Sequence, residues 1–303
     1  MHSCRVLSLV FLFASTFAHD APPLAISAPP PPIDLKPDAS GTVPQAQIRD
    51  LLHRVAEHDL ENEKRLRDYT YVQREEEHKL DSHGNVKKIE SSTSEVLVIY
   101  GEQVERLIAK NDKPLSENET KKEEDRIQKI TDKRKNESDS ARRKRLDKEE
   151  KDREDARKFV LEVADAYNFR LMGNELLDGR ETWVLDAEPR PSYQPKSREA
   201  KVLPKLKGLI WIDKAEMQWK KFDVTTTDTI SFGLFLARVH KGTRIVFETN
   251  RINEEVWLPK HLSLHVDIRV ALLKNFNEDL EQTYRDYKKF RIDTKFTVVG
   301  ETQ

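Results

Sequence analysis

The sequence has almost no cysteine, no long apolar run and no excess of charge of either sign. It holds one cysteine in 303 residues, Cys4, so a chain cleaved after it would have neither a disulfide nor thiol chemistry. Lys and Arg number 53 against 54 Asp and Glu, which argues against a strongly basic nucleic-acid-binding protein. The lack of repeated long apolar segments excludes a polytopic membrane protein.

Motifs of common catalytic sites are also missing. The sequence holds no G-x-S-x-G elbow, no P-loop and no G-x-G-x-x-G. His261 and His265 share a predicted strand face with Asp267, as metal ligands can, but a solvated polar face is the favoured interpretation. Asp213 follows an apolar run and is the strongest acid–base candidate, although a strand end explains it better. We therefore expect no enzyme activity, cofactor or metal.

The N-terminus predicts an exported protein. Arg5 and the apolar residues 6–13 have the pattern of a signal peptide over residues 1–18, with an uncleaved anchor as the alternative. Cys4 precedes the apolar run, so it is not placed as the lipid-accepting cysteine of a bacterial lipoprotein. Residues 19–44 are rich in proline and are predicted to be a linker without a core.

Residues 45–299 are predicted to form a single domain. Apolar residues at helical spacing indicate an amphipathic helix over 45–66, and alternating residues indicate a hairpin over 69–100 and a strand over 104–110. Residues 116–168 are a charged insertion, predicted as one exposed helix that begins at a Ser116–Glu119 capping box and docks from Phe159 onward. Its apolar residues are too few for a coiled coil.

From residue 169 onward the pattern is almost entirely that of strands. Strands are expected at 169–177, 181–187, 209–213, 218–226, 231–240, 244–251, 262–273 and 280–299, with a proline loop at 189–204 and a turn at 274–278. Short connections between many strands favour one large antiparallel sheet, curved or partly closed. The fold class is therefore α+β, mainly β.

Two predicted strands differ in the polarity of their faces. Residues 261–270 alternate strictly between polar and apolar, so one face of that strand is wet. In residues 231–240 the apolar side chains occupy both faces, so something must cover both. Ordinary core beneath the helices is one explanation. A concave apolar cavity for a lipid or an acyl chain is the other.

Short motifs in this half of the chain resemble the outer-membrane lipoprotein-sorting group, with LolA and its LolB-like and RseB-like relatives. They are G-L-I-W-I-D at 208–213, V-W-L-P at 256–259 and Y-R-D-Y-K-K-F at 284–290. The resemblance covers residues 169–297, and 45–110 more loosely. It implies a large curved antiparallel sheet, an incomplete β-barrel whose concave apolar side is capped by helices and accepts acyl chains. The insertion at 116–168 and the loop at 189–204 depart from the compact carriers.

The leading hypothesis is a periplasmic carrier-like protein, a monomer that shields the acyl chain of a lipid or an acylated lipoprotein. An envelope sensor or protein-interaction module that uses the charged helix as a contact arm is the alternative, and an exported hydrolase is the weakest. Nucleic acid is not an expected partner. The residues expected to line the cavity or its lid are Trp211, Phe232, Leu234, Phe235, Leu236, Leu264, Val266 and Phe290.

Overall fold

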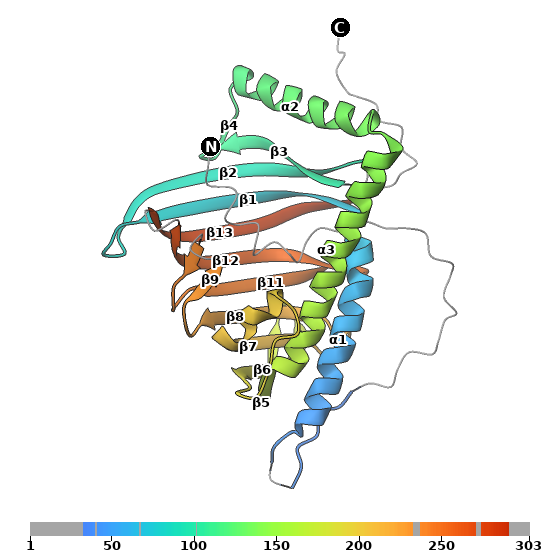
Figure 1. Cartoon of the computed structure of the whole chain (residues 1–303), viewed down its shortest axis with the longest axis vertical. Coiled ribbons are helices and arrows are strands. Elements are labelled where there is room, and N and C mark those ends of the chain that lie inside the picture. Colours follow the sequence, from blue (N-terminus) through green and yellow to red (C-terminus); the bar gives the residue numbers. More distant parts are fainter. Residues whose placement is uncertain are drawn as a thin grey trace.

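The computed structural model describes residues 33–39, 41–66, 68–100, 102–232, 237–270 and 274–290 (Figure 1). The predicted signal peptide lies outside these residues. The helices are α1 (Gln45–Leu66), α2 (Glu117–Lys135), α3 (Asp139–Ala166) and the 3-10 helix η4 (Glu199–Lys205). The strands are β1 (Tyr69–Leu80), β2 (Val86–Ile99), β3 (Glu102–Lys110), β4 (Lys113–Pro114), β5 (Tyr167–Leu177), β6 (Arg180–Pro189), β7 (Leu206–Asp213), β8 (Trp219–Thr226), β9 (Ile230–Phe232), β10 (Ala237–Val239), β11 (Arg244–Ile252), β12 (Val256–Val270) and β13 (Lys274–Lys289).

All the strands belong to one antiparallel sheet, as the sequence predicts. Its order is β4-β3-β2-β1-β13-β12-β11-β8-β7-β6-β5, and the short β9–β10 hairpin pairs with the end of β12. β1 pairs with β13, which joins the N-terminal hairpin to the C-terminal strands. No pairing joins β4 to β5 within the described residues, so the sheet stays open rather than closing into a barrel.

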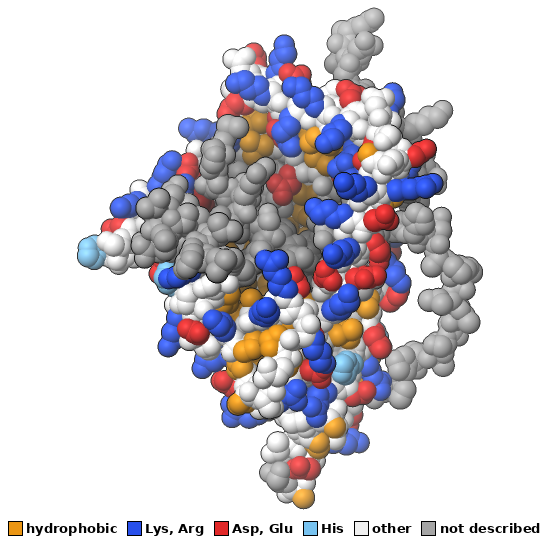
Figure 2. Space-filling model, in the orientation of Figure 1, with side chains coloured by type: hydrophobic (Ala, Val, Ile, Leu, Met, Phe, Trp, Pro, Cys, Tyr) orange, Lys and Arg blue, Asp and Glu red, His pale blue; other side chains and the backbone are white. Residues whose placement is uncertain are grey.

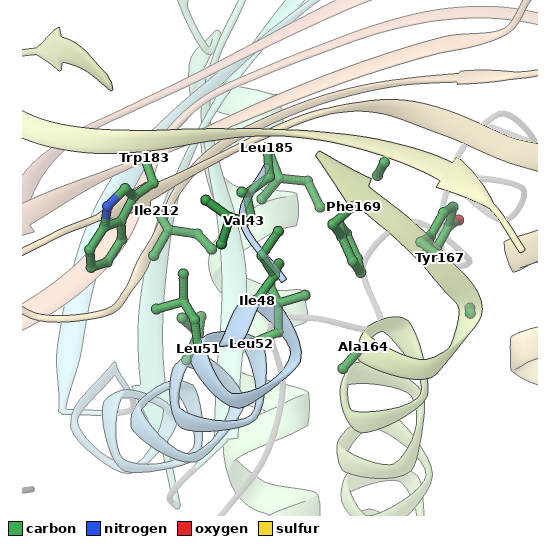
Figure 3. Packing of buried hydrophobic residues seen from close by; sticks show 14 of the residues in the cluster. Val43, Ile48, Leu51, Leu52, Ala164, Tyr167, Phe169, Trp183, Leu185 and Ile212 are labelled. Atoms are coloured by element: carbon green, nitrogen blue, oxygen red, sulfur yellow. The ribbon is translucent and has the colours of Figure 1, made fainter. Parts of the chain in front are cut away.

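The helices α1 and α3 cross one side of the sheet (Figure 1). The apolar stripe of α1 lies against β5, β6 and β7, and the C-terminal end of α3 packs beside it. Figure 3 shows Ile48, Leu52 and Ala164 from the helices pointing toward Phe169 and Leu185 on the strands. This main core fixes both helices at the β5 end of the sheet, because burial of apolar side chains is the dominant favourable contribution to folding.

The end of the predicted linker belongs to the fold. Leu35 and Val43 are 6% and 4% exposed, and both pack into the main core beside α1, with Ile33 against it. The composition of residues 19–44 obscured this, because a proline-rich chain can still bury individual apolar side chains where it crosses a core. The domain therefore begins before residue 45.

The charged insertion forms two helices rather than the single predicted one. α2 begins at the expected capping box, in which Ser116 and Glu119 bond to each other's backbone N–H groups. α2 ends at Asn136, and Ser138 then caps α3 by accepting the N–H of Ala141. Both capping residues are present in the sequence, but the unbroken charge pattern conceals the break. The α2–α3 turn places α2 along the β3 edge of the sheet (Figure 1).

Residues 231–240 do not form the single predicted strand. β9 and β10 pair antiparallel with Ala237 opposite Phe232, so the chain reverses between them. The apolar residues of this run therefore do not belong to the two faces of one strand. The argument that both faces of such a strand must be covered fails. Only Gly233 marks a turn in the run, which is why the strand pattern conceals the reversal.

The predicted turn at 274–278 is also wrong. Lys274 lies opposite Val270 as the first residue of β13, and pairing with β12 continues to Thr283 opposite His261. The polar residues Asn275 and Asn277 alternate with Phe276, which is the period of a strand with one polar side rather than of a turn.

Side chains from helices cover both edges of the sheet. On β3, the Glu123 carboxylate accepts the N–H of Leu107 at 2.8 Å, and Arg126 donates to the carbonyl of Glu105. Both bonds come from α2, which has no buried residue of its own. α2 therefore attaches to the sheet through polar contacts with an edge strand, where unpaired backbone groups otherwise invite aggregation.

The other edge is covered at Phe169 of β5. The Gln45 carboxamide, at the start of α1, accepts the Phe169 N–H at 3.0 Å and donates to the Phe169 carbonyl. One side chain thus reproduces both bonds that a neighbouring strand would make. This contact ties the beginning of α1 to the strand that the helix covers.

Candidate functional site: the helix-facing side of the sheet

The strand register identifies the side chains that share a face with the helices. Leu185 and Ile210 lie opposite each other and belong to the main core beneath α1. Ile210 lies opposite Phe222, Phe222 opposite Phe247, and Phe247 opposite Leu262. The rings of Phe222 and Phe247 are 5.2 Å apart. One apolar row therefore runs across five strands, from the core to β12.

Beyond this row lies a second apolar cluster, which we call the apolar floor. Its buried members are Leu264, Val266 and Ile268 of β12 and Leu280 of β13, and Val239 and Ile245 pack against them. Leu264 lies directly opposite both Ile245 and Leu280. Among the described residues, no side chain of α1, α2 or α3 belongs to the apolar floor. It is thus a part of the helix-facing side on which none of the described helices packs.

The same side becomes polar at β1. Gln282 lies opposite Leu262 and Glu75, and Tyr284 lies opposite Gln73. Both glutamines are buried, and the Tyr284 hydroxyl donates to the Gln282 Oε1 at 2.8 Å. The alternation of Gln73 and Glu75 in β1 could have revealed this surface. Its completion by β13, about 200 residues later, could not be read from the sequence.

Burial disfavours the charged form of the ionisable groups on this polar surface. Burial raises the pKa of Glu75, and the nearby Glu105 and Glu77 raise it further. The pKa values of Tyr71 and Tyr284 are also raised, mainly by burial. The Tyr71 hydroxyl and the side-chain amides of Gln73 and Gln282 carry hydrogen-bond donors. A donor-bearing surface next to an apolar floor suits an amphipathic ligand.

α1 contributes one further ionisable group. Asp59 lies four residues after Val55 and three after Ala56, on the stripe of α1 that is buried. Burial raises its pKa to about 7, and Glu63 one turn later adds repulsion between like charges. Sequence reasoning missed Asp59 because a single carboxylate in a charged helix has no distinguishing pattern.

Of the residues expected to line a cavity, the structure brings Leu264 and Val266 together in the apolar floor. Trp211 lies elsewhere. It falls between two residues of the main core and so faces the opposite side of the sheet, where its Nε1 donates to Glu175 at 2.6 Å. The ammonium group of Lys221 lies 5.3 Å from its ring. Trp211 therefore shares no surface with the floor.

The remaining expected residues are only partly described. Phe290 follows β13 and its N–H bonds to the carbonyl of Asp68, beyond the pairing of β1 with β13. Phe232 ends β9, at the point where the chain reverses. Leu234, Phe235 and Leu236 lie outside the described residues. The cavity assignment thus remains a prediction for these positions.

His261 and His265 lie on the polar side of the sheet, which is the interpretation that the sequence favoured. His261 bonds to Glu281 at 2.5 Å and His265 bonds to Asp279, across the β12–β13 pairing on the side away from the helices. Asp267 is exposed on the same side. Within the ranges that the structure describes, no group of three or more metal-ligating side chains comes together.

The motifs that carry the family resemblance stabilise the sheet in this chain. Asp213 is 1% exposed and receives two bonds from the Arg180 guanidinium, whose carbon lies 5.1 Å from the ring centre of Trp257. One arginine thus joins the ends of two motifs. Gly208 allows β7 to approach β8, because a Cβ there would lie 2.0 Å from the Asp223 carbonyl oxygen. Asp213 anchors a strand end.

Comparison with known proteins finds similarity at the level of structure only. No protein-family model matches the chain, and no curated protein matches it. A DUF1329 family protein from Desulfovibrio piger is 10% identical with a TM-score of 0.30, over 83% of this chain and 95% of that one. A putative outer membrane lipoprotein-sorting protein domain from Vibrio parahaemolyticus (11%, TM-score 0.27) covers 80% and 95%. A LolA superfamily protein from Nitrosomonas europaea (10%, 0.27) covers 80% and 93%.

The group that the sequence motifs resemble thus appears again among solved structures, as expected. TM-scores of 0.27 to 0.30 are too low to carry an argument about function. Any functional conclusion must therefore come from the side chains of this chain. None of the described helices combines the length and apolar character needed to cross a membrane.

Proposed function

We propose that this protein binds an acyl chain of a lipid or lipoprotein on the helix-facing side of its sheet, and shields it from water without catalysing a reaction. The observation that carries the proposal is the apolar floor, a cluster of sheet residues to which no described helix residue contributes. The polar surface beside it offers hydrogen-bond donors to a head group or ester. Export, which residues 1–18 predict, and a place in the periplasm, which the family resemblance implies, belong to the same proposal.

The way α3 is attached supports reversible access. Its residues in or against the main core are Phe159, Val163, Ala164 and Ala166, all near its C-terminal end. The N-terminal part crosses the helix-facing side of the sheet (Figure 1), and its described residues contribute to no apolar cluster. Apolar packing thus holds only the C-terminal end of α3, so movement of its N-terminal part would break the Arg145–Glu102 ion pair but expose little buried apolar area.

The energetic scale is sufficient for binding. Each methylene that leaves water contributes about 0.8 kcal/mol, so ten buried methylenes contribute about 8 kcal/mol before the cost of ordering the chain is subtracted. That gross value would correspond to roughly micromolar affinity, and the ordering cost makes the net affinity weaker. Contacts of the head group with the polar surface would add to the binding free energy.

A pair of adjacent substitutions tests the proposal. Ile245 packs on the apolar floor, whereas Val246, its half-buried neighbour in β11, faces the other side of the sheet. Ile245→Asp should weaken binding of a fluorescent fatty acid at least about tenfold, because it places a charge beside the chain. Val246→Asp should leave the affinity within about twofold. Urea unfolding of both variants shows whether each is folded.

The proposal is wrong if the folded wild-type protein binds no fatty acid below its critical micelle concentration. It is also wrong if the two variants lose affinity equally, because the bound chain would then not lie on the helix-facing side.

A further inference from the structure

The turn between α2 and α3 concentrates positive charge. Residues 129–148 hold nine Lys and Arg against four Asp and Glu, although the whole chain carries a net charge of −1. Seven of these cations are exposed and take part in no salt bridge within the described residues. We call them the basic elbow: Lys129, Lys133, Lys135, Arg142, Arg143, Lys144 and Lys148. Figure 2 shows Lys and Arg side chains over α2 and the neighbouring part of α3.

A half-buried ionic clamp holds the basic elbow against β3. The Glu102 carboxylate binds Arg134 through one oxygen and Arg145 through the other, the latter at 2.6 Å. Arg145 also binds Glu137 at 2.8 Å, and this contact lowers the pKa of Glu137. The clamp joins both helices to the sheet and uses two cations and two carboxylates. The seven cations of the elbow lie outside the clamp and exceed the three remaining acidic residues of this segment, Asp132, Asp139 and Asp147.

Helix stability explains Lys133 and Lys135, which lie in the last turn of α2 where the dipole favours cations, but it does not explain the cations of α3. Arg142, Arg143 and Lys144 directly follow the first turn of α3, near the positive end of the helix dipole, where cations gain nothing and acidic residues are favoured. Asp139 is the acidic residue in that turn. Four of the seven cations lie in α3, so the composition of this helix works against its own dipole. A role outside the fold is a better explanation.

We propose that the basic elbow docks this protein on an anionic lipid surface. Lysines and arginines close to such a surface are attracted by its negative potential. The described part of α2 and of α3 up to Lys148 exposes no large apolar side chain, so an apolar protein interface and helix insertion are both disfavoured. Tyr100, 57% exposed and two residues before Glu102, is suited to the head-group region. The preference for lipid over other polyanions rests on the proposed function, since acyl chains come from membranes.

The test measures sedimentation of the full chain with vesicles of 30% phosphatidylglycerol in phosphatidylcholine, and with pure phosphatidylcholine. The wild type should bind the anionic vesicles, lose that binding as salt rises, and ignore the neutral ones. Changing Arg142, Arg143, Lys144 and Lys148 to Gln should lower the affinity at least about 30-fold. The matched control changes four exposed, unpaired lysines elsewhere to Gln: Lys87, Lys113, Lys201 and Lys241. This control variant alters the net charge equally, and its affinity for the anionic vesicles should fall less than about threefold.

Wild-type protein that does not bind the anionic vesicles overturns the proposal. Equal losses in the two fourfold variants also overturn it, since net charge would then explain the binding. Binding to soluble polyglutamate without vesicle binding would assign the elbow to an acidic protein instead. Binding of monomeric fatty acid is measured on the same samples and should not change. A wrong proposal for membrane docking by the basic elbow is thereby distinguished from a wrong proposal for the acyl-chain site.

Discussion

The carboxyl group of Asp59 is expected to make this protein less stable as the pH rises. Its pKa is about 7 in the folded chain against 3.8 in the unfolded one, because the group lies on the buried stripe of α1 beside Glu63. Between these pH values the folded state binds more protons than the unfolded state, so stability falls with increasing pH. The stabilisation is complete below pH 4 and lost above pH 7.

The magnitude follows from the shift. About three pKa units at 1.36 kcal/mol each correspond to a contribution on the order of 4 kcal/mol. Asp59→Asn removes the ionisation and should therefore raise the free energy of unfolding at pH 8 by a few kcal/mol, with little change at pH 4. Urea unfolding of the wild type and the variant at both pH values measures the difference.

Asp50→Asn is the matched control on the same helix. Asp50 is exposed and pairs with Arg54 one turn later at 3.2 Å, a contact of a kind that contributes only about 0.3–0.5 kcal/mol. Its substitution should change stability little at either pH. Asp59 itself is half-buried, and parallel pH profiles for the wild type and Asp59→Asn would refute the desolvation of this carboxyl in the folded chain.

Three further substitutions test the packing. Gln45→Ala removes both bonds to the edge of β5 and should lower the free energy of unfolding by about 2 kcal/mol in urea titrations; no loss would mean that water replaces the side chain. Asp213→Asn leaves Arg180 without its buried counter-charge, so thermal unfolding should show a loss of about 3 kcal/mol, and an unchanged Tm would contradict the anchoring role. Gly208→Ala must separate β7 from β8, because its Cβ would meet the Asp223 carbonyl; wild-type stability would disprove this close approach.

The elements with a clear period were predictable. The apolar stripe of α1 predicted its bounds, Gln45–Leu66, because a 22-residue amphipathic helix repeats its signal over six turns. The strict alternation of residues 261–270 likewise revealed which side of β12 is buried. From these local periods the large antiparallel sheet and its polar outer side followed.

What the sequence concealed depends on contacts between distant segments. The break at Asn136 is hidden because charged residues fill both sides of it, and the capping signal of Ser138 is short. The β9–β10 reversal falls in an apolar run without a strong turn signal. The polar surface needs Gln73 of β1 and Tyr284 of β13 as neighbours, a pairing between residues far apart in the chain. Of the predicted cavity, Leu264 and Val266 coincide with the apolar floor, whereas Trp211 faces away.

Mapping a photoreactive fatty acid on the full chain tests the central claim most directly. After illumination and digestion, mass spectrometry should find the label on Ile245, Leu264 or Val266, which form or adjoin the apolar floor. Excess unlabelled fatty acid should abolish the labelling. Label confined to exposed apolar residues such as Met172 and Leu176 on the β5 edge, or no saturable labelling at all, would contradict an acyl-chain site on the helix-facing side of the sheet.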